Sequence, residues 1–260
     1  KQHLLRAQAR LSHDYTRVKN TEALYYLGYL YRTTGENQKA EDAYWAATWT
    51  PEYKHRSFYE LAVMAVNAKE YAGALDLITQ SLYVGERDLQ ALTLKAYILR
   101  MLGDKELALE TIAYIQQIDP LDYWSAAEKS LLTAGNASFL RVGNNYNSKG
   151  IIAVQEMLEV ASNYMTIGAV KDALAVLDEA ISIGEPYAGY PLVYYYKAAN
   201  LLKSGDKESA LDCIEQAQKL SPLDNYPFRL EEIGLFRSIL EVKPDDSFAC
   251  YYLGNLLYYL

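Results

Sequence analysis

The stretch TEALYYLGYLYRTTGENQKAEDAYWAATWTP, residues 21–51, decides the fold. Five tyrosines and two tryptophans make it rich in large rings, yet Gly28, Ala40, Ala43 and Ala47 are small. The apolar residues on either side of Gly35 recur at intervals of three and four, which predicts one apolar face on each of two α-helices. A glycine between such segments ends the first helix, and a proline after the second stops it. The stretch therefore predicts a helix–turn–helix hairpin.

The same hairpin recurs along the chain. Ala40, Ala74 and Ala108 lie 34 residues apart, twice in succession, and the frame around them returns at Ala173 and Ala210. Small side chains at these points let helix backbones approach, whereas a larger side chain would cost about 1–3 kcal/mol through overpacking. Bulky residues then fill the neighbouring holes, because helices pack ridge into groove. We expect these packing contacts at Gly28, Ala40, Ala47, Ala62, Ala74, Ala96, Ala108, Ala161, Ala173, Ala180, Ala198, Ala210, Ala217 and Gly254.

The frame of Leu-Gly, Tyr, Ala, a large apolar residue, Ala and Pro resembles the tetratricopeptide repeat (TPR), over roughly two-thirds of the chain. The resemblance implies an all-α fold, a right-handed α-solenoid of antiparallel helix pairs. Its repeats are expected at 21–51, 52–86, 87–120, 151–186 and 187–222, after an N-terminal helix in 1–20. On this prediction, residues 1–260 form one solenoid.

Three regions depart from the repeat. Residues 121–150 begin as a helix but continue as AGNASFLRVGNNYNSKG, which predicts a degenerate repeat with a loop. GEPYAGYP, residues 184–191, lengthens one connection. Residues 223–244 have room for a single unpaired helix, from about Arg229 to Val242, which should change the path of the solenoid. Residues 245–260 read as the first helix of a truncated repeat, and the ragged ends indicate a segment of a longer protein.

In the TPR family, the first helices of successive repeats line a concave groove that binds ligands. The paired Lys and Asn residues that hold a terminal carboxylate in some members are absent, because tyrosines and Val63 stand at the equivalent positions. Tyr and Arg are enriched at binding hot spots. The predicted groove residues are Tyr25, Tyr29, Arg32, Tyr59, Asn67, Tyr97, Arg100, Tyr195, Asn255 and Tyr258. The same carry-over also gives Val63, Leu158, Ser162, Met165, Ala199, Leu202 and Tyr251.

No motif for catalysis, a cofactor or a metal occurs in the sequence, so an enzyme is not expected. His3, His13 and His55 lie in different segments and are interpreted as solvated surface residues. Cys213 is expected to be buried packing, since neither Lys nor His flanks it. The neighbouring Glu231 and Glu232 are not read as a catalytic pair, because they point about 100° apart and one exposed helix supplies no cleft.

Composition limits the partners. The apolar fraction of 51% and the charged fraction of 22% are those of a folded protein. A net charge of −8 argues against nucleic acid as a partner, and no apolar run approaches the ~18 residues of a membrane span. Two cysteines cannot form a disulfide framework, which favours a reducing, cytoplasmic location. Tyrosine dominates the aromatic residues, with 25 Tyr against 5 Phe and 3 Trp.

Three functions remain open. The leading hypothesis is a protein-interaction scaffold whose groove binds a peptide, a partner protein or another domain of its own polypeptide. The second rests on PFRLEE (227–232) and YYLGNLLY (251–258), which look like the TPR region of large bacterial proteins with a β-sandwich similar to galactose mutarotases. That resemblance implies an accessory module docked on a sugar-acting domain. The third is self-association through apolar faces at the unpaired ends.

Overall fold

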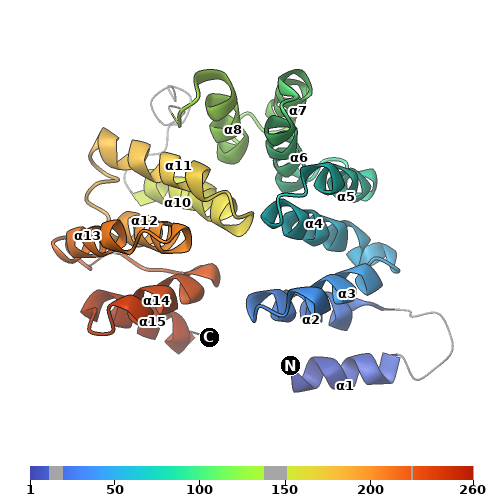
Figure 1. Ribbon diagram of the computed structural model, residues 1–260, viewed down its shortest axis with the longest axis horizontal. Helices are drawn as coiled ribbons and strands as arrows, with labels where there is room; N and C mark the ends of the chain where they lie inside the picture. Colours follow the sequence, from blue (N-terminus) through green and yellow to red (C-terminus); the bar gives the residue numbers. More distant parts are fainter. Residues whose placement is uncertain (12–19, 138–150, 224, 260) are drawn as a thin grey trace. The chain divides into compact units, whose positions relative to one another are not determined.

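The computed structural model describes residues 1–11, 20–137, 151–223 and 225–259, and the regular secondary structure within these ranges is α-helix, with no β-strand (Figure 1). The fold is an all-α helical repeat, as the sequence predicts. Contacts between helices divide the chain into two compact units, Lys1–Ser125 and Ala126–Leu260. Because each unit is described by itself, one continuous solenoid over 1–260 stays a prediction. None of the described helices combines the length and apolar character that crossing a lipid bilayer requires.

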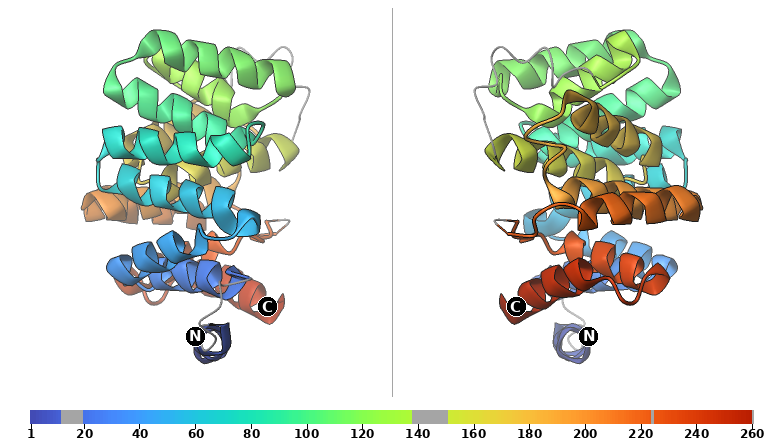
Figure 2. Two further views of the ribbon diagram at one scale, coloured as in Figure 1. Left: turned by 90° about the vertical axis from the view of Figure 1, so that its right-hand side faces the viewer. Right: turned by 90° about the vertical axis from the view of Figure 1, so that its left-hand side faces the viewer.

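The first unit is built from consecutive helix pairs. Its helices are α1 (Gln2–Leu11), α2 (Glu22–Thr33), α3 (Asn37–Ala47), α4 (Pro51–Asn67), α5 (Tyr71–Val84), α6 (Leu89–Leu102) and α7 (Lys105–Ile118). The pairs α2–α3, α4–α5 and α6–α7 each pack together, and each pair packs on the next, so that the helices lie in layers (Figure 2, left). The sequence expects a helix within 1–20; α1 ends at Leu11, and residues 12–19 lie outside the described ranges.

The second unit continues the pattern. α8 (Tyr123–Ala134) crosses the boundary at Ser125, and α10 (Ile151–Thr166), α11 (Val170–Ile183), α12 (Pro191–Ser204), α13 (Lys207–Gln218), α14 (Glu231–Val242) and α15 (Ser247–Tyr259) follow (Figure 2, right). The loop expected within 121–150 falls mainly on residues 138–150, which lie outside the described ranges. The pairs α10–α11 and α12–α13 form hairpins like those of the first unit.

One turn geometry joins the two helices of five hairpins. In each, a residue with positive φ follows the first helix, and the next backbone N–H donates to a carbonyl five residues earlier, as in the hydrogen bond from Asp104 N to Leu99 O at 2.9 Å. This is the left-handed helix ending that favours glycine. The positive-φ residues are Gly35 (77°), Lys69 (63°), Gly103 (87°), Gly168 (72°) and Gly205 (86°). The 34-residue period thus fixes the turns as well as the helix faces.

Small residues occupy the helix contacts. All twelve alanines expected there, from Ala40 to Ala217, have 0% of their surface exposed. A Cβ added at Gly28 would lie 2.7 Å from the ring of Tyr44, itself fully buried, so α2 and α3 approach too closely there for any side chain. Gly254 differs, because it is exposed and an added Cβ would meet nothing within 4 Å. The expectation that Gly254 makes a packing contact is therefore wrong.

The end of the chain also differs from the expectation of an unpaired helix in 223–244. α14 packs against α15, and it reaches back to α12 rather than extending the stack from α13. α14 and α15 are therefore a pair, and α14 takes the position of a first helix beside α10 and α12. This arrangement places three first helices side by side in the second unit.

Candidate functional site

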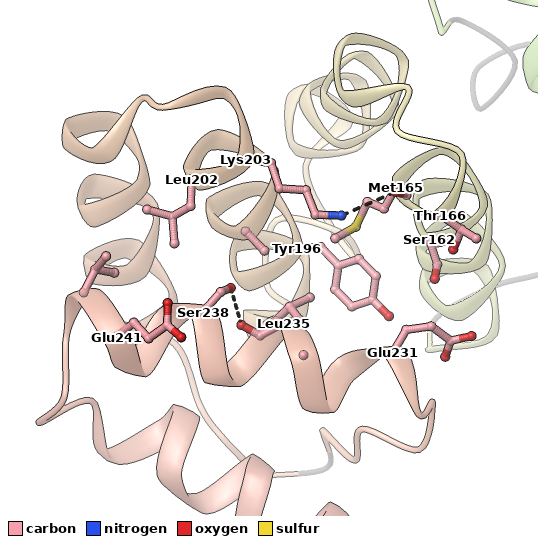
Figure 3. Close-up of a pocket in the computed structure, with 13 residues that line it drawn as sticks. Ser162, Met165, Thr166, Tyr196, Leu202, Lys203, Glu231, Leu235, Ser238 and Glu241 are labelled. Atoms are coloured by element: carbon pink, nitrogen blue, oxygen red, sulfur yellow. Dashed lines mark hydrogen bonds between the residues drawn. The ribbon is translucent and has the colours of Figure 1, made fainter. Parts of the chain in front are cut away.

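A cavity of about 550 Å³ lies between α10, α12 and α14 (Figure 3). Each helix contributes one face, and α14 lines the cavity along its whole length, from Glu231 to Val242. Part of the lining is exposed, including Lys203, Glu231 and Gly234, so the cavity opens to solvent. Its volume lies in the range that proteins use to hold ligands.

Small and apolar side chains together create the cavity. Ser162, Ala199, Gly234 and Ser238 come from three different helices and are too small to fill the space between them. A Cβ at Gly234 would meet nothing within 4 Å, so this helical position opens into free space. The larger lining residues are mostly apolar: Met165, Leu202, Leu235 and Val242.

Two side chains that precede or begin α14 hold it against its neighbours. Arg229 donates from Nη1 to Gln155 Oε1 at 2.8 Å and from Nη2 to Gln155 O at 3.0 Å, which ties α14 to α10. Glu232 is fully buried and accepts from the N–H groups of Phe228 and Arg229, both at 2.8 Å, and from the Tyr196 hydroxyl at 2.9 Å. Burial raises the pKa of Glu232, although these hydrogen bonds and Arg229 act to lower it.

These contacts correct the sequence interpretation of Glu231 and Glu232. α14 is not an exposed helix without a cleft, because Glu231 lines the cavity while Glu232 points into the core. The two side chains do point in different directions, as the sequence analysis expected of neighbouring residues on a helix. The PFRLEE segment therefore has a structural role in this chain, which is to fix the third wall of the cavity.

α15 is held by a second buried network. Asp246 caps α15 by accepting from Ala249 N at 2.7 Å, and the same oxygen accepts from the Tyr195 hydroxyl at 2.7 Å. Its other oxygen accepts from Gln218 Nε2 at 2.8 Å. Tyr195 is fully buried and packs edge-on against Phe236. Burial and the Asp246 carboxylate raise the pKa of Tyr195 well above its usual range. Tyr195 is thus a core residue, and its prediction as a groove residue is wrong.

Charge in the cavity comes from three side chains. Glu231 and Glu241 are exposed on α14, ten residues apart in the chain, and lie toward opposite ends of the cavity (Figure 3). Lys203 projects from α12, and its Nζ donates to the Met165 carbonyl oxygen at 3.4 Å. Desolvation of that ammonium end lowers the pKa of Lys203. The cavity is therefore apolar on its walls, with one cation and two carboxylates.

Among the predicted groove residues of the first unit, three tyrosines surround an ion pair formed by the fourth residue, Arg32. Arg32 Nη2 lies 3.4 Å from Glu60 Oε2, and the Arg32 guanidinium lies 5.8 Å from the centre of the Tyr29 ring. The Glu60 carboxylate acts electrostatically on Tyr25 and Tyr59 and, together with burial, raises the pKa of Tyr25 to about 12. The structure therefore brings Tyr25, Tyr29, Arg32 and Tyr59 together, around a carboxylate that the sequence analysis did not select.

Glu60 is an unusual residue to find buried. Burial raises its pKa, and the Arg32 charge acts against that shift. Arg32 Nε, Glu60 Oε2 and the Tyr44 hydroxyl are buried without a hydrogen-bond partner in the described part of the chain. Tyrosine rings thus surround the pair, and the opposite charges of Arg32 and Glu60 attract each other there.

The remaining predicted groove residues are dispersed. Tyr97 is buried, and the Arg100 guanidinium stacks 5.1 Å from its ring centre. Asn67 donates to Val63 O of its own helix at 2.8 Å. Asn255 is half-buried and Tyr258 is 85% exposed, both on α15. Of the further positions carried over, Val63 and Leu158 are fully buried and Tyr251 is exposed, whereas Ser162, Met165, Ala199 and Leu202 all line the cavity.

His55 makes polar contacts between helices, and Cys213 is buried. His55 is not simply solvated, because its Nδ1 lies 2.9 Å from the Ser81 carbonyl oxygen and its Nε2 lies 3.0 Å from Asp88 Oδ2, linking α4 to α5 and α6. His3 is exposed, and His13 lies outside the described residues. Cys213 is buried, which raises the pKa of its thiol. Within the described ranges, no three His, Cys, Asp or Glu residues gather as metal ligands.

A scan against protein-family models finds none that matches, and a search of curated proteins finds none either. Solved structures of similar fold include YrrB, titled a TPR protein with an unusual peptide-binding site, at 14% identity and TM-score 0.41, covering 95% of this chain and 96% of that chain. A TPR protein from Parabacteroides merdae ATCC 43184 has 18% identity and TM-score 0.42, covering 89% and 87%. MamA has 13% identity and TM-score 0.37, covering 76% and 90%.

Proposed function

We propose that the protein is an interaction scaffold and that the cavity between α10, α12 and α14 holds a peptide segment of its partner. The observation that carries this proposal is the set of small residues, Ser162, Ala199, Gly234 and Ser238, which leaves room between three tightly fixed helices. The cavity stays open although larger side chains at these positions would fill it. Arg229 and Glu232 hold α14, which forms one of its walls, in place. Rigid walls favour binding, because little conformational entropy is lost when a ligand enters.

The chemistry of the lining suits contact rather than reaction. Its apolar residues can bury aliphatic side chains, and Lys203 offers a donor to a peptide carbonyl or carboxylate. The Ser238 hydroxyl already donates to Leu235 O at 2.7 Å in its own helix, so it is not activated as a nucleophile. No histidine or cysteine is among the lining residues. A non-enzymatic role is part of the proposal.

The tyrosines around Arg32 form a second proposed contact surface, in the first unit. Tyr25, Tyr29 and Tyr59 are half-buried, so each ring keeps a face that a partner can cover. Tyr97, Arg100, Asn67, Asn255 and Tyr258 stay predictions as contact residues. A tyrosine can bury its ring while its hydroxyl stays hydrated, which suits such a surface.

Gly234 gives the test of the cavity. A phenylalanine at Gly234 places its ring in the open space beside α14, whereas an alanine adds a single methyl group. Random peptides displayed on phage are selected against the wild-type chain and then measured on Gly234→Ala and Gly234→Phe. We expect the selected peptides to bind the wild type and Gly234→Ala alike and to lose at least about tenfold in affinity for Gly234→Phe.

The control is the fold of the variants. Circular dichroism should show the same helical signal for all three proteins, because neither side chain meets an existing atom within 4 Å of its Cβ. Peptides that bind Gly234→Phe as tightly as the wild type would remove the cavity from the proposal.

The alternative of an accessory module on a sugar-acting domain gains no support from the described residues. PFRLEE, on which that resemblance partly rests, is accounted for by the contacts of Arg229 and Glu232. Self-association stays a prediction. Tyr251, Leu257 and Tyr258 are exposed on α15, and light scattering over a concentration series would reveal a dimer formed through them.

A further inference from the structure

We infer that the peptide recognised by the cavity is basic at both ends of its bound segment, with apolar residues between two Lys or Arg side chains. This inference rests on the proposed function and names the chemistry of the partner. It starts from the positions of the charged side chains that line the cavity, Lys203, Glu231 and Glu241.

Two carboxylates stand at the ends of an apolar surface. Glu231 and Glu241 both line the cavity from α14, and neither has an ion pair or hydrogen bond to another residue in the described part of the chain. Ten residues of helix separate them by about 15 Å. Between them α14 presents Gly234, Leu235 and Ser238, which carry no charge. The surface thus has the order acidic, apolar, acidic.

The positive charge in the lining does not reverse this order. Lys203 stands on α12, and its Nζ donates to the Met165 carbonyl oxygen rather than to either glutamate (Figure 3). An acidic peptide would meet one cation and two unpaired carboxylates. A basic peptide could pair with Glu231 and Glu241 while its backbone carbonyl accepts from Lys203.

The spacing sets the length of the bound segment. An extended strand rises about 3.3 Å per residue, so about 15 Å corresponds to four or five residues. Successive side chains of a strand point to opposite faces, so two basic residues with three apolar or small residues between them face the same way and reach both glutamates. Side chains of the central residues would enter the space left by Ser162, Ala199, Gly234 and Ser238.

The charge of the whole unit favours the same partner. Residues 126–260 contain 11 Lys and Arg against 17 Asp and Glu, a net charge of −6, whereas residues 1–125 contain 14 against 16, a net charge of −2. Most of the acidic excess thus belongs to the unit that holds the cavity. The electrostatic field of this negative charge speeds the association of a cationic partner, and added salt weakens the effect.

The experiment compares three pentapeptides of the form X-valine-leucine-serine-X, labelled with a fluorophore and capped at both ends. X is lysine, glutamine or glutamate, and binding to the full chain is followed by fluorescence anisotropy at low and high salt. We expect the lysine peptide to bind about three- to tenfold more tightly than the glutamine peptide, and the glutamate peptide to bind most weakly.

Matched variants separate local contacts from overall charge. Glu231→Gln with Glu241→Gln should abolish the preference for lysine. Asp212→Asn with Glu215→Gln changes the net charge equally, on exposed positions of α13 outside the cavity, and should leave most of the preference intact. An equal loss of preference in both double variants would overturn the inference, because the charge of the unit and not the glutamate pair would then select the peptide.

The remaining outcomes tell the two proposals apart. Equal affinity for the lysine and glutamine peptides, or no measurable binding of the lysine peptide, overturns the basic specificity. Peptides selected from the random library that still lose affinity for Gly234→Phe would then leave the scaffold function standing. If Gly234→Phe binds every peptide as the wild type does, the cavity itself is not the site and both proposals fail.

Discussion

At the scale of the residue, two glycines inside helices show how local space decides the sign of a substitution. Gly28 and Gly234 both lie in helices, where alanine is favoured over glycine by about 0.5–1 kcal/mol. An added Cβ would collide with the Tyr44 ring at Gly28 but meets open space at Gly234. We expect Gly28→Ala to lower the free energy of unfolding by about 1–3 kcal/mol and Gly234→Ala to raise it by up to about 1 kcal/mol. Urea unfolding followed by circular dichroism measures both; two changes of the same sign would contradict the packing account.

The Arg32–Glu60 pair gives a second prediction at this scale. Arg32→Met leaves a buried carboxylate without its cation, which we expect to cost about 2–3 kcal/mol near pH 7. Burial already raises the Glu60 pKa above 4.5, so the folded state binds a proton there more readily than the unfolded state. Stability from this group is therefore present below about pH 4.5 and is lost as pH rises through the folded pKa.

This sign makes the prediction checkable. The loss caused by Arg32→Met should shrink as the pH of urea unfolding is lowered toward 4.5, because Glu60 is then neutral. Adding Glu60→Gln to Arg32→Met should restore most of the loss at pH 7. A loss that is independent of pH, with no recovery in the double variant, would show that Arg32 contributes packing rather than charge compensation.

The sequence could not have selected Glu60. Its neighbour Tyr59 occupies the groove position of the repeat, while Glu60 faces Arg32 on a different helix, 28 positions away. A charged residue within a repeat frame is ordinarily solvated. Only the contact between α2 and α4 makes it a buried partner. Tyr195 is the opposite case. Its place in the repeat matches a groove position, but its side chain is buried in the core and donates to Asp246.

At the scale of the element, the hairpin turns were predictable and carry their own test. Four of the five turns place glycine at the left-handed position, but the turn between α4 and α5 places Lys69 there, at φ 63°. A left-handed conformation costs a residue with a Cβ about 1–2 kcal/mol. We expect Lys69→Gly to stabilise the protein by about 0.5–1 kcal/mol, since part of that strain is offset by the greater unfolded-state entropy of glycine.

Two controls frame the Lys69 prediction. Lys69→Ala keeps the strained φ and should change the thermal midpoint little. Gly103→Ala introduces the same strain into the equivalent turn between α6 and α7 and should lower the midpoint. If Lys69→Gly and Lys69→Ala shift the midpoint equally, the effect belongs to loss of the lysine side chain and not to the turn.

The pairing of α14 with α15 could not be predicted at this scale. The 34-residue period predicts the helices and turns inside a hairpin. It does not predict where a segment such as α14 packs, because that segment does not follow the period. Residues 219–230 connect α13 to α14, and long-range contacts then decide where α14 lies, above all Arg229 with Gln155, 74 positions away. The third wall of the cavity and its two carboxylates come from α14, so the sequence predicted four lining positions on α10 and α12 and none on α14.

At the scale of the whole molecule, the tyrosines that dominate the composition are distributed between core and surface. The all-α repeat was predictable, because alanine spacing and helical periodicity act locally and recur. The use of tyrosine was not, since the same residue type packs as a core ring at Tyr44 and stands 85% exposed at Tyr258. Burial raises the pKa of core tyrosines such as Tyr44.

Alkaline titration reports on this distribution in one measurement. Burial raises the pKa of Tyr25 to about 12 and raises those of Tyr44, Tyr195 and Tyr196 well above their usual range, while an unfolded tyrosine ionises near pH 10. Above about pH 10 the unfolded state therefore releases protons that the folded state keeps, so the free energy of unfolding falls as pH rises.

We expect the near-ultraviolet absorbance of tyrosinate to rise in two steps, the first from exposed rings with the helical signal intact. The second should coincide with loss of helix, because these buried hydroxyls reach water only when the pairs of helices separate. A single step near pH 10 with full helicity retained would place the tyrosines of both units at the surface, and the packing of rings against alanines and glycines would then not be what holds the repeats together.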